Sequence, residues 1–282
     1  MVLIADSGST KTDWLIGQTS VRTQGLNPVH LSEAQIMEAV RQELLPQIDP
    51  EEVSSVYFYG SGVRPELEGL MADVLRQAFP KAAHVEAHSD MLGAARALCG
   101  SSQGIACILG TGANSCVYDG LHITGNSPAL GYILGDDGSG AALGKRLLRC
   151  LYKGVFRKEI VSNFEEETGL SVPTIINKVY RQPMPNRFLA SLSEYVGRHL
   201  SDFPEFQAMV RANFLDFIDN DILPYRRIDL PVSFVGSIAW FYERQLREAA
   251  DIAQLEVGVV CRSPLQGLVE FHKNLKHSDN EN

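Results

Sequence analysis

Two turns built from small and hydroxyl residues are the stretches of this sequence best suited to binding an anion. Residues 7–12 follow an apolar run that begins at Val2, and residues 110–115 follow another at 104–109. Because such residues have little side-chain bulk, their backbone N–H groups can approach phosphate oxygens and their hydroxyls can add hydrogen bonds. The chain contains no G-x-x-x-x-G-K-[ST] segment of the Walker A type. The sequence therefore predicts two phosphate-binding turns of another kind.

Asp6 stands where the first apolar run ends, beside the first turn. A carboxylate there is placed to hold a Mg²⁺ ion next to phosphates, directly or through water. A polar hairpin with an acidic shoulder explains the same residues, since Gly and Ser are ordinary turn residues. Two such turns, about 100 residues apart, favour the first interpretation. They suggest two similar halves that face one cleft, with one phosphate loop from each half.

Two further small-residue segments lie in the second half of the chain. Asp136 and Asp137 sit in a glycine-rich stretch before a helix predicted from Ala141. Their oxygens can bind a polyol, or the two residues can cap the helix and favour its N-terminal end. Gly236 and Ser237 end a strand at 230–237. A small pair at that point permits the close approach of a flat ring such as adenine, and a plain strand-to-helix turn is the alternative.

Hydrophobic periodicity predicts the elements that position these segments. The first 100 residues have the order strand, strand, strand, helix, strand, helix, strand, helix, which implies a mixed sheet covered by helices. Ser32 and Gln35 form a capping box, and Pro65 opens the next helix. The pattern restarts at Gly104, residues 157–222 are expected to be helical, and one clear stripe there contains Phe206, Val210, Phe214 and Phe217. These aromatic residues are predicted to be core.

Composition and charge limit the class of protein. The 282 residues are 45% hydrophobic, which suggests two domains with sizeable cores, and the formal net charge is −9. This charge argues against a general nucleic-acid or membrane-surface binder. No leader peptide is visible, and no apolar run approaches the roughly 18 residues of a membrane span. Five cysteines without a C-x-x-C pair indicate reduced thiols, so we expect a cytoplasmic protein.

Six motifs in order resemble those of the N-acetylglucosamine kinase branch of the BadF/BadG/BcrA/BcrD ATPases, within the superfamily of acetate and sugar kinases, actin and heat-shock chaperones. The matching segments are the first phosphate motif at 6–12, the sugar-binding asparagine turn at 26–30, the segment of the catalytic aspartate at 88–90, the second phosphate motif at 110–114, the sugar-binding glycine–aspartate motif at 131–139 and the adenosine motif at 235–237. The chain departs from the pattern at Ser7 and Ser9, where relatives often have glycine, and at Leu130, where an aromatic residue is usual.

The resemblance implies an α/β fold of two ribonuclease H-like domains, with mixed βββαβα-type sheets, flanking an ATP cleft. The N-terminal domain is expected at 1–103, with the last helix, about 264–277, returning to it. The C-terminal domain is expected at 104–263, with a helical insertion at 157–222.

The resemblance also implies an ATP-dependent kinase that phosphorylates the primary hydroxyl of an amino sugar, N-acetylglucosamine first of all, with ATP and Mg²⁺ as cofactors. Asp90 is expected to be the catalytic base, although it can equally be the N-cap of a helix that starts at Met91. Asp6 is expected to hold Mg²⁺ through water. The other implied contacts are Ser9, Thr10, Lys11, Gly110, Thr111 and Gly112 for the phosphates, Gly236 and Ser237 for the nucleoside, and Asn27, Asp90, Asn114, Gly131 and Asp136 for the sugar.

Other functions are compatible with the same sequence. Glucosamine or N-acetylmuramic acid are alternative acceptors, and a non-catalytic sensor of ATP and sugar would use the same residues. A BadF-type ATPase activator would hold an iron–sulfur cluster with cysteines at a dimer interface. Cys107 and Cys116 alternate with apolar residues in predicted strands, which favours core packing over that role. The expected partners are small molecules, without nucleic acid or membrane, and a homodimer is allowed.

Overall fold

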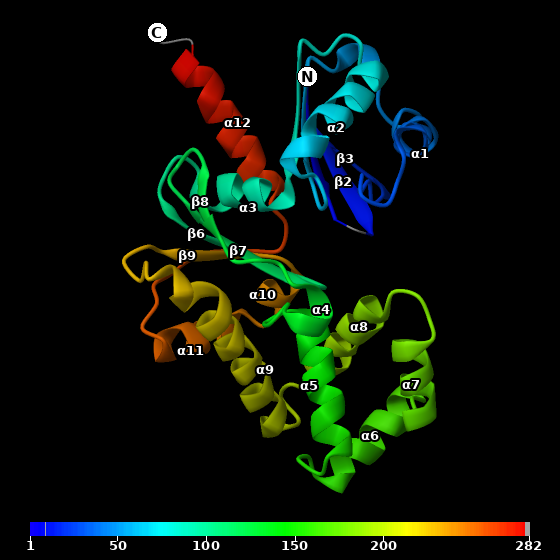
Figure 1. The fold of residues 1–282 in the computed structure, drawn as a ribbon, viewed down its shortest axis with the longest axis vertical. Coiled ribbons are helices and arrows are strands. Elements are labelled where there is room, and N and C mark those ends of the chain that lie inside the picture. The colour runs from blue at the N-terminus through cyan, green and yellow to red at the C-terminus, as the bar shows by residue number, and fades with distance from the viewer. Residues whose placement is uncertain (9, 280–282) are drawn as a thin grey trace. The chain divides into compact units, whose positions relative to one another are not determined.

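The computed structural model describes residues 1–8 and 10–279, with side chains described through Asn274. The chain divides into two compact units (Figure 1). The first contains Met1–Ser102, Asp119–Ile123 and the segment from Pro264 onward, and the second contains Gln103–Tyr118 and Thr124–Ser263. Within residues 1–8 and 10–279, none of the helices combines the length and the apolar character that crossing a membrane would require.

A five-stranded mixed sheet in the order β3-β2-β1-β4-β5 forms the centre of the first unit. Strand β1 pairs antiparallel with β2 and parallel with β4, and β4 pairs parallel with β5. The elements are β1 (Val2–Ser7), β2 (Lys11–Ile16), β3 (Thr19–Gln24), α1 (Glu33–Ala39), a π-helical turn (Val40–Leu44), a 3₁₀ turn (Pro50–Glu52), β4 (Ser55–Gly60), α2 (Pro65–Ala78), β5 (His84–Ser89), α3 (Asp90–Cys99) and α12 (Leu265–Asp279).

The second unit has its own five-stranded sheet, in the order β10-β9-β6-β7-β8. The strands are β6 (Gly104–Leu109), β7 (Ala113–Tyr118), β8 (Ile123–Asn126), β9 (Val232–Val235) and β10 (Val257–Cys261). The helices are α4 (Gly131–Leu134), α5 (Gly140–Tyr152), α6 (Lys158–Thr168), α7 (Val172–Tyr180), α8 (Pro185–Arg198), α9 (Pro204–Phe217), α10 (Ser237–Phe241) and α11 (Glu243–Ile252), with a π-helical turn (Ile218–Ile222) and a 3₁₀ turn (Leu223–Tyr225).

The two sheets repeat one topology. Strand β6 pairs antiparallel with β7 and parallel with β9, as β1 does with β2 and β4. The helices α6 to α9 lie between β8 and β9 in the chain, where the sequence predicted a helical insertion. The α/β class with two mixed sheets is therefore confirmed, and so is the restart of the pattern at Gly104.

Local signals account for several element boundaries. Ser32 Oγ accepts a hydrogen bond from the N–H of Gln35, and Gln35 Oε1 accepts one from the N–H of Ser32, so the capping box is confirmed. The chain after Gly236 forms two helices, α10 and α11, which are separated at Tyr242. Tyr242 has φ −113° and ψ 27°, and its buried hydroxyl donates to the carbonyl of Ser193. Tertiary packing of one side chain thus interrupts a helical pattern.

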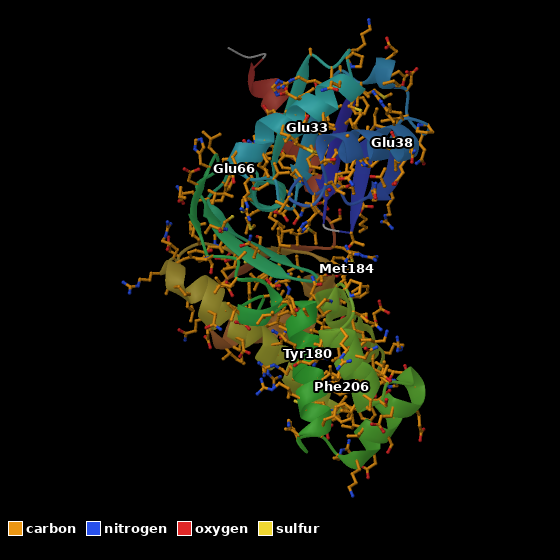
Figure 2. All side chains as sticks on the ribbon, turned by 45° about the vertical axis from the view of Figure 1, so that its right-hand side comes forward. Glu33, Glu38, Glu66, Tyr180, Met184 and Phe206 are labelled. Carbon is orange, nitrogen blue, oxygen red and sulfur yellow. The ribbon has the colours of Figure 1, made fainter. Side chains whose placement is uncertain are left out.

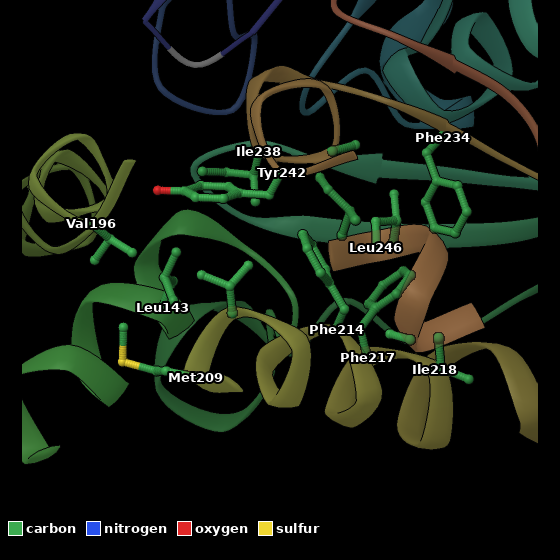
Figure 3. Packing of buried hydrophobic residues seen from close by; sticks show 14 of the residues in the cluster. Leu143, Val196, Met209, Phe214, Phe217, Ile218, Phe234, Ile238, Tyr242 and Leu246 are labelled. Carbon is green, nitrogen blue, oxygen red and sulfur yellow. The ribbon is translucent and has the colours of Figure 1, made fainter. Parts of the chain in front are cut away.

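The aromatic stripe of α9 lies in the hydrophobic core of the second unit (Figure 3). Phe206, Phe214 and Phe217 are fully buried, which confirms that they are core residues. Cys107 and Cys116 are fully buried as well, as their alternation with apolar residues predicted. Carboxylates lie outside such cores, and Figure 2 shows examples on α1 and α2, where Glu33, Glu38 and Glu66 are exposed.

Helix α12 packs against α3 and β1 in the first unit (Figure 1). The hydroxyl of Tyr59 on β4 lies 2.8 Å from Nε2 of His272 on α12, and Nη1 of Arg96 on α3 donates to the same hydroxyl at 2.8 Å. Burial lowers the pKa of His272 to about 3, so the imidazole is neutral. This network joins α12, β4 and α3, and α3 is the helix that begins with Asp90.

The close contact of α12 with α3 generates a stability prediction. A Cβ atom at Gly267 would lie 2.3 Å from the carbonyl oxygen of Ala97, whereas a Cβ at the exposed Gly69 in α2 would meet nothing within 4 Å. We expect Gly267→Ala to lower the free energy of unfolding by about 1–3 kcal/mol, because the two helix backbones must separate. Gly69→Ala, the matched control, should raise it by up to about 1 kcal/mol. Denaturant titrations followed by circular dichroism check this, and equal effects of the two variants would contradict the packing.

Candidate active site

The carboxyl ends of three parallel strands meet at one edge of the first sheet. The strand register places Ser7 of β1 beside Gly60 of β4, and Gly60 beside Ser89 of β5. Asp6 is the penultimate residue of β1, and Asp90 directly follows β5. The two predicted acidic site residues therefore lie near this edge, and the negative charge of Asp90 contributes to the raised pKa of Asp6.

Asp90 is the first residue of α3, and it does not cap that helix. The N-cap is Ser89, whose Oγ accepts a hydrogen bond from the N–H of Leu92 at 3.2 Å. The alternative in which Asp90 caps a helix starting at Met91 is therefore wrong. Serine and aspartate are both good N-caps, so the sequence could not decide between them. Asp90 Oδ1 accepts the N–H of Met91 at 2.9 Å, and burial raises the pKa of this carboxyl to about 6.

Asp6 is a partly buried carboxylate with few compensating charges. Burial raises its pKa to about 7, and the negative charges of Asp90 and Asp13 act in the same direction. Lys11 only partly opposes this shift, and its Nζ lies 2.5 Å from Asp13 Oδ2 in an exposed ion pair. Carboxylate oxygens without a dedicated cation fit the oxygen ligands that Mg²⁺ prefers. The donor set near Asp6 is thus compatible with the predicted metal.

The first turn uses part of its hydroxyl groups internally. Ser7 Oγ lies 2.8 Å from Thr12 Oγ1 and accepts the N–H of Leu26 at 3.1 Å. The N–H of Gly8 donates to the carbonyl of Lys11 at 2.9 Å, which closes the turn. Thr10 is exposed, and the predicted contact Ser9 lies outside the described residues. The buried hydroxyls of Ser7 and Thr12 therefore hold the turn against residues 24–26, and among the described residues of the turn Thr10 has the exposed hydroxyl.

The side chain of Asn27 packs against Gly62, a residue that was not predicted to belong to the site. The side chain of Asn27 is 9% exposed, and its Oδ1 accepts the N–H of Val29 at 2.9 Å. Gly62 has φ +80°, and a Cβ atom there would lie 2.3 Å from Asn27 Oδ1. The signal was present in the sequence, because Gly60, Ser61 and Gly62 form a third small-residue turn after an apolar strand.

The second unit repeats this arrangement at the carboxyl ends of β6 and β9, which run parallel. Gly110 directly follows β6, and Gly236 directly follows β9. Gly236 has φ +125°, and a Cβ atom there would lie 2.3 Å from the carbonyl oxygen of Leu109. Ser237 is exposed at the first position of α10. The predicted second phosphate turn and the predicted adenosine pair are therefore neighbours at one edge of the second sheet.

The second phosphate turn is attached to the N-terminus of α5. The N–H of Gly140 donates to the carbonyl of Gly110 at 2.8 Å, and the N–H of Ala141 donates to that of Thr111 at 3.2 Å. Ser139 caps the helix by accepting the N–H of Ala142 at 3.1 Å. These N–H groups of α5 are therefore engaged by protein oxygens. The N–H groups of Gly140, Ala141 and Ala142 are therefore not offered to an anion.

Asp136 lies directly on that turn. A Cβ atom at Gly112 would lie 2.9 Å from Asp136 Oδ2, and the backbone N–H of Ala113 acts on the same carboxylate to lower its pKa. Burial raises the pKa of Asp136. Asn114 Oδ1 accepts the N–H of Ser115 at 2.9 Å. Gly131 opens the exposed one-turn helix α4, which the sequence analysis did not predict, with φ +72°.

The predicted residues thus form two groups, one in each unit. Near one edge of the first sheet the structure places Asp6, Thr10, Lys11, Asn27 and Asp90. Near one edge of the second it places Gly110, Thr111, Gly112, Asn114, Asp136, Gly236 and Ser237.

No family model and no curated protein matches this chain. A crystal structure of a "putative N-acetylglucosamine kinase" from Porphyromonas gingivalis is 44% identical to it, with a TM-score of 0.93, over 97% of this chain and 99% of that one. A protein of the same description from Chromobacterium violaceum is 19% identical, with a TM-score of 0.68, over 96% and 98% of the two chains. The second likeness shows the fold alone.

The alignment with the Porphyromonas gingivalis protein covers 97% of this chain and therefore extends over both units. This chain belongs to the N-acetylglucosamine kinase-like family.

Proposed function

We propose that this protein is an ATP-dependent kinase that phosphorylates the primary hydroxyl of an amino sugar, with N-acetylglucosamine as the acceptor and N-acetylglucosamine 6-phosphate as the product. The observation that carries the proposal is the placement of Asp90, a partly buried carboxylate at the same edge of the first sheet as Asp6, in a chain 44% identical to a protein described as a "putative N-acetylglucosamine kinase".

Asp90 has the properties of an acceptor base. Phosphoryl transfer to an alcohol needs a group that receives the hydroxyl proton as the new oxygen–phosphorus bond forms. A pKa of about 6 makes Asp90 a stronger base than an ordinary carboxylate while leaving it mostly ionised at neutral pH. Ser89 caps α3, so the Asp90 carboxylate interacts with the backbone N–H groups of Met91 and of Asp90 itself and does not cap the helix. Its remaining lone pairs are free to accept a sugar hydroxyl.

The phosphate and metal contacts fall to the small-residue turns. Bound ATP supplies the phosphoryl group, and Mg²⁺ neutralises charge on its phosphates. Asp6 would orient the metal through water, and the hydroxyls of Thr10 and Thr111 would hydrogen-bond phosphate oxygens. Gly236 and Ser237 would face the nucleoside, where the absence of bulk lets a ring approach.

The sugar contacts fall to amide side chains. Asn27 Oδ1 is occupied by Val29 N–H, which fixes the orientation of the amide and leaves Nδ2 as a donor to a sugar oxygen. Asn114 Oδ1 is likewise occupied by Ser115 N–H, so its Nδ2 is oriented too. Gly131, at the exposed start of α4, would approach the acetamido group through its backbone. Two oriented amides suit an acceptor with several hydroxyls and an acyl oxygen.

Asp90→Asn tests the base directly. The amide keeps the shape of the side chain and cannot receive the proton, so we expect kcat with N-acetylglucosamine to fall by about 10³-fold or more. The affinity for ATP should remain within about twofold, because Asp90 is not assigned to the nucleotide. Steady-state rates and calorimetric ATP titrations check both values. The control is Asp73→Asn, which removes an exposed carboxylate of α2 paired with Arg76 and should leave both unchanged.

Substantial residual turnover by Asp90→Asn would remove this residue as the base. Loss of ATP binding in the same variant would show instead that Asp90 serves the nucleotide.

The raised pKa of Asp90 predicts two pH dependences. The base must be ionised, so kcat/KM should fall as the pH drops through about 6. In the ligand-free protein the folded pKa lies above the ordinary value of 3.8. Folding therefore favours the protonated form, and stability from this group is lost as the pH rises through about 6. Asp90→Asn should thus be more stable than wild type by on the order of 1–2 kcal/mol near pH 8, and equally stable near pH 4. Unfolding titrations at both pH values would refute this if the difference did not change.

Gly62→Ala tests whether the contact between Gly62 and Asn27 positions the sugar-binding amide. A methyl group at this position overlaps the amide, so we expect the KM for the sugar to rise about tenfold while ATP affinity stays constant. Gly100→Ala is a matched control, since Gly100 also has a positive φ, +59°, but a Cβ there meets nothing within 4 Å. Equal sugar KM values in the two variants would show that Asn27 does not position the sugar.

A further inference from the structure

We infer that Asp136 is a positioning residue for the nucleotide, which holds the second phosphate turn, residues 110–113, in its binding conformation. This inference rests on the proposed function, because it assigns a task within the same site. It differs from the sugar contact expected from the sequence, and the two roles predict different kinetic effects.

The contact between Asp136 and the turn is close on two sides. A Cβ atom at Gly112 would lie 2.9 Å from Oδ2, 3.2 Å from Cγ and 3.4 Å from Oδ1 of Asp136, so the carboxylate lies against the glycine. The backbone N–H of Ala113 acts on the same carboxylate and lowers its pKa, against the effect of burial. One side chain therefore lies against one residue of the turn and interacts with the backbone of the next.

Asp136 supplies the side-chain part of a larger attachment. The other two connections are the bonds from Gly140 and Ala141 N–H to the carbonyls of Gly110 and Thr111. Both use α5 backbone groups, which orient the carbonyls toward the helix. The N–H of Gly110 donates to the carbonyl of Gly112 at 2.9 Å, and we assign the N–H groups of Thr111 and Gly112 as the donors of this turn to a phosphate. Fixing the surrounding peptides pre-orients these two donors, which lowers the entropic cost of binding.

The backbone of Asp136 is held in an unfavourable conformation. Its φ is +56°, which is uncommon for residues other than glycine, although aspartate and asparagine tolerate it. Its carbonyl accepts the N–H of Ser139 at 3.1 Å, which ties the strained residue to the cap of α5. Asp137 adds a like charge nearby, and Lys145 is the cation that opposes it. Strain and like charge at one residue indicate a constraint that the fold maintains for this contact.

The test compares four variants and one control. Asp136→Ala removes the carboxylate, and we expect the Kd and KM for ATP to rise about tenfold while the KM for the sugar stays within about twofold. Asp136→Asn keeps an acceptor for Ala113 N–H and tolerates the positive φ, so it should stay within about threefold of wild type. Asp229→Ala removes the same charge from an exposed side chain of the same unit, which is paired with Arg227, and should leave ATP affinity unchanged.

Gly112→Ala and the double variant Gly112→Ala/Asp136→Ala complete a cycle. The added methyl group displaces the carboxylate, so Gly112→Ala should weaken ATP binding about as much as Asp136→Ala does. Both substitutions break the same contact between Asp136 and Gly112. The Kd of the double variant for ATP should therefore be no higher than that of the single variant with the higher Kd. The same non-additivity should appear in the midpoint of thermal unfolding, measured without ligand.

Several results would overturn the inference. A raised sugar KM with unchanged ATP affinity in Asp136→Ala would assign this residue to the sugar, and full additivity of the cycle would show that Asp136 and Gly112 act independently. Asp136→Asn as impaired as Asp136→Ala would show that the hydrogen bond is not the cause. These outcomes are separate from the proposed function: if the wild type bound ATP and phosphorylated no sugar, that function would fail, while the binding and unfolding cycles would still decide the role of Asp136.

Discussion

Close approach of the main chain at the ends of parallel strands is the constraint on which the candidate site depends. The amide of Asn27 lies against Gly62 in the first unit, and the carboxylate of Asp136 lies against Gly112 in the second. In both places a Cβ atom would lie too close to the polar group, 2.3 Å from Asn27 Oδ1 and 2.9 Å from Asp136 Oδ2. Glycine is therefore required by contact at both positions, and at Gly62 also by its φ of +80°. Because these turns consist of small residues, their backbone N–H groups remain accessible to an anion.

Burying the carboxyl groups of Asp6 and Asp90 costs free energy, and their neighbours are arranged in a specific way. Burial raises the pKa of Asp6 to about 7 and that of Asp90 to about 6. Both carboxyl groups therefore ionise less easily in the folded protein than they would in water. Ser89 is the N-cap of α3, and the ammonium group of Lys11 forms an ion pair with Asp13. Lys11 and the N–H of Met91 lower the two pKa values only in part, since both remain above the ordinary value. A site that bears such a cost with only partial compensation is typical of groups kept for a ligand or a reaction.

The sequence was sufficient for the elements and insufficient for the contacts. Apolar runs followed by small-residue turns predicted both sheets, Ser32 and Gln35 predicted a cap, and the spacing of Phe206, Phe214 and Phe217 predicted a core stripe. These signals are local. The contact between Asp136 and Gly112 depends on the positive φ of Asp136 and on the packing of α5 against the turn. Neither feature can be predicted from the spacing of residues in the sequence. The interruption at Tyr242 likewise follows from a bond to Ser193 on another helix.

The central claim is that the two groups of residues transfer a phosphoryl group from ATP to a sugar hydroxyl. The most direct measurement is the identification of the product, by phosphorus NMR and mass spectrometry, after incubation with ATP, Mg²⁺ and a panel of N-acetylglucosamine, glucosamine, glucose and N-acetylmuramic acid. The account predicts N-acetylglucosamine 6-phosphate in stoichiometric amounts with ADP. Phosphorylation of another sugar alone would contradict the assigned acceptor. ATP binding without any phosphorylated sugar would contradict the kinase and indicate a sensor.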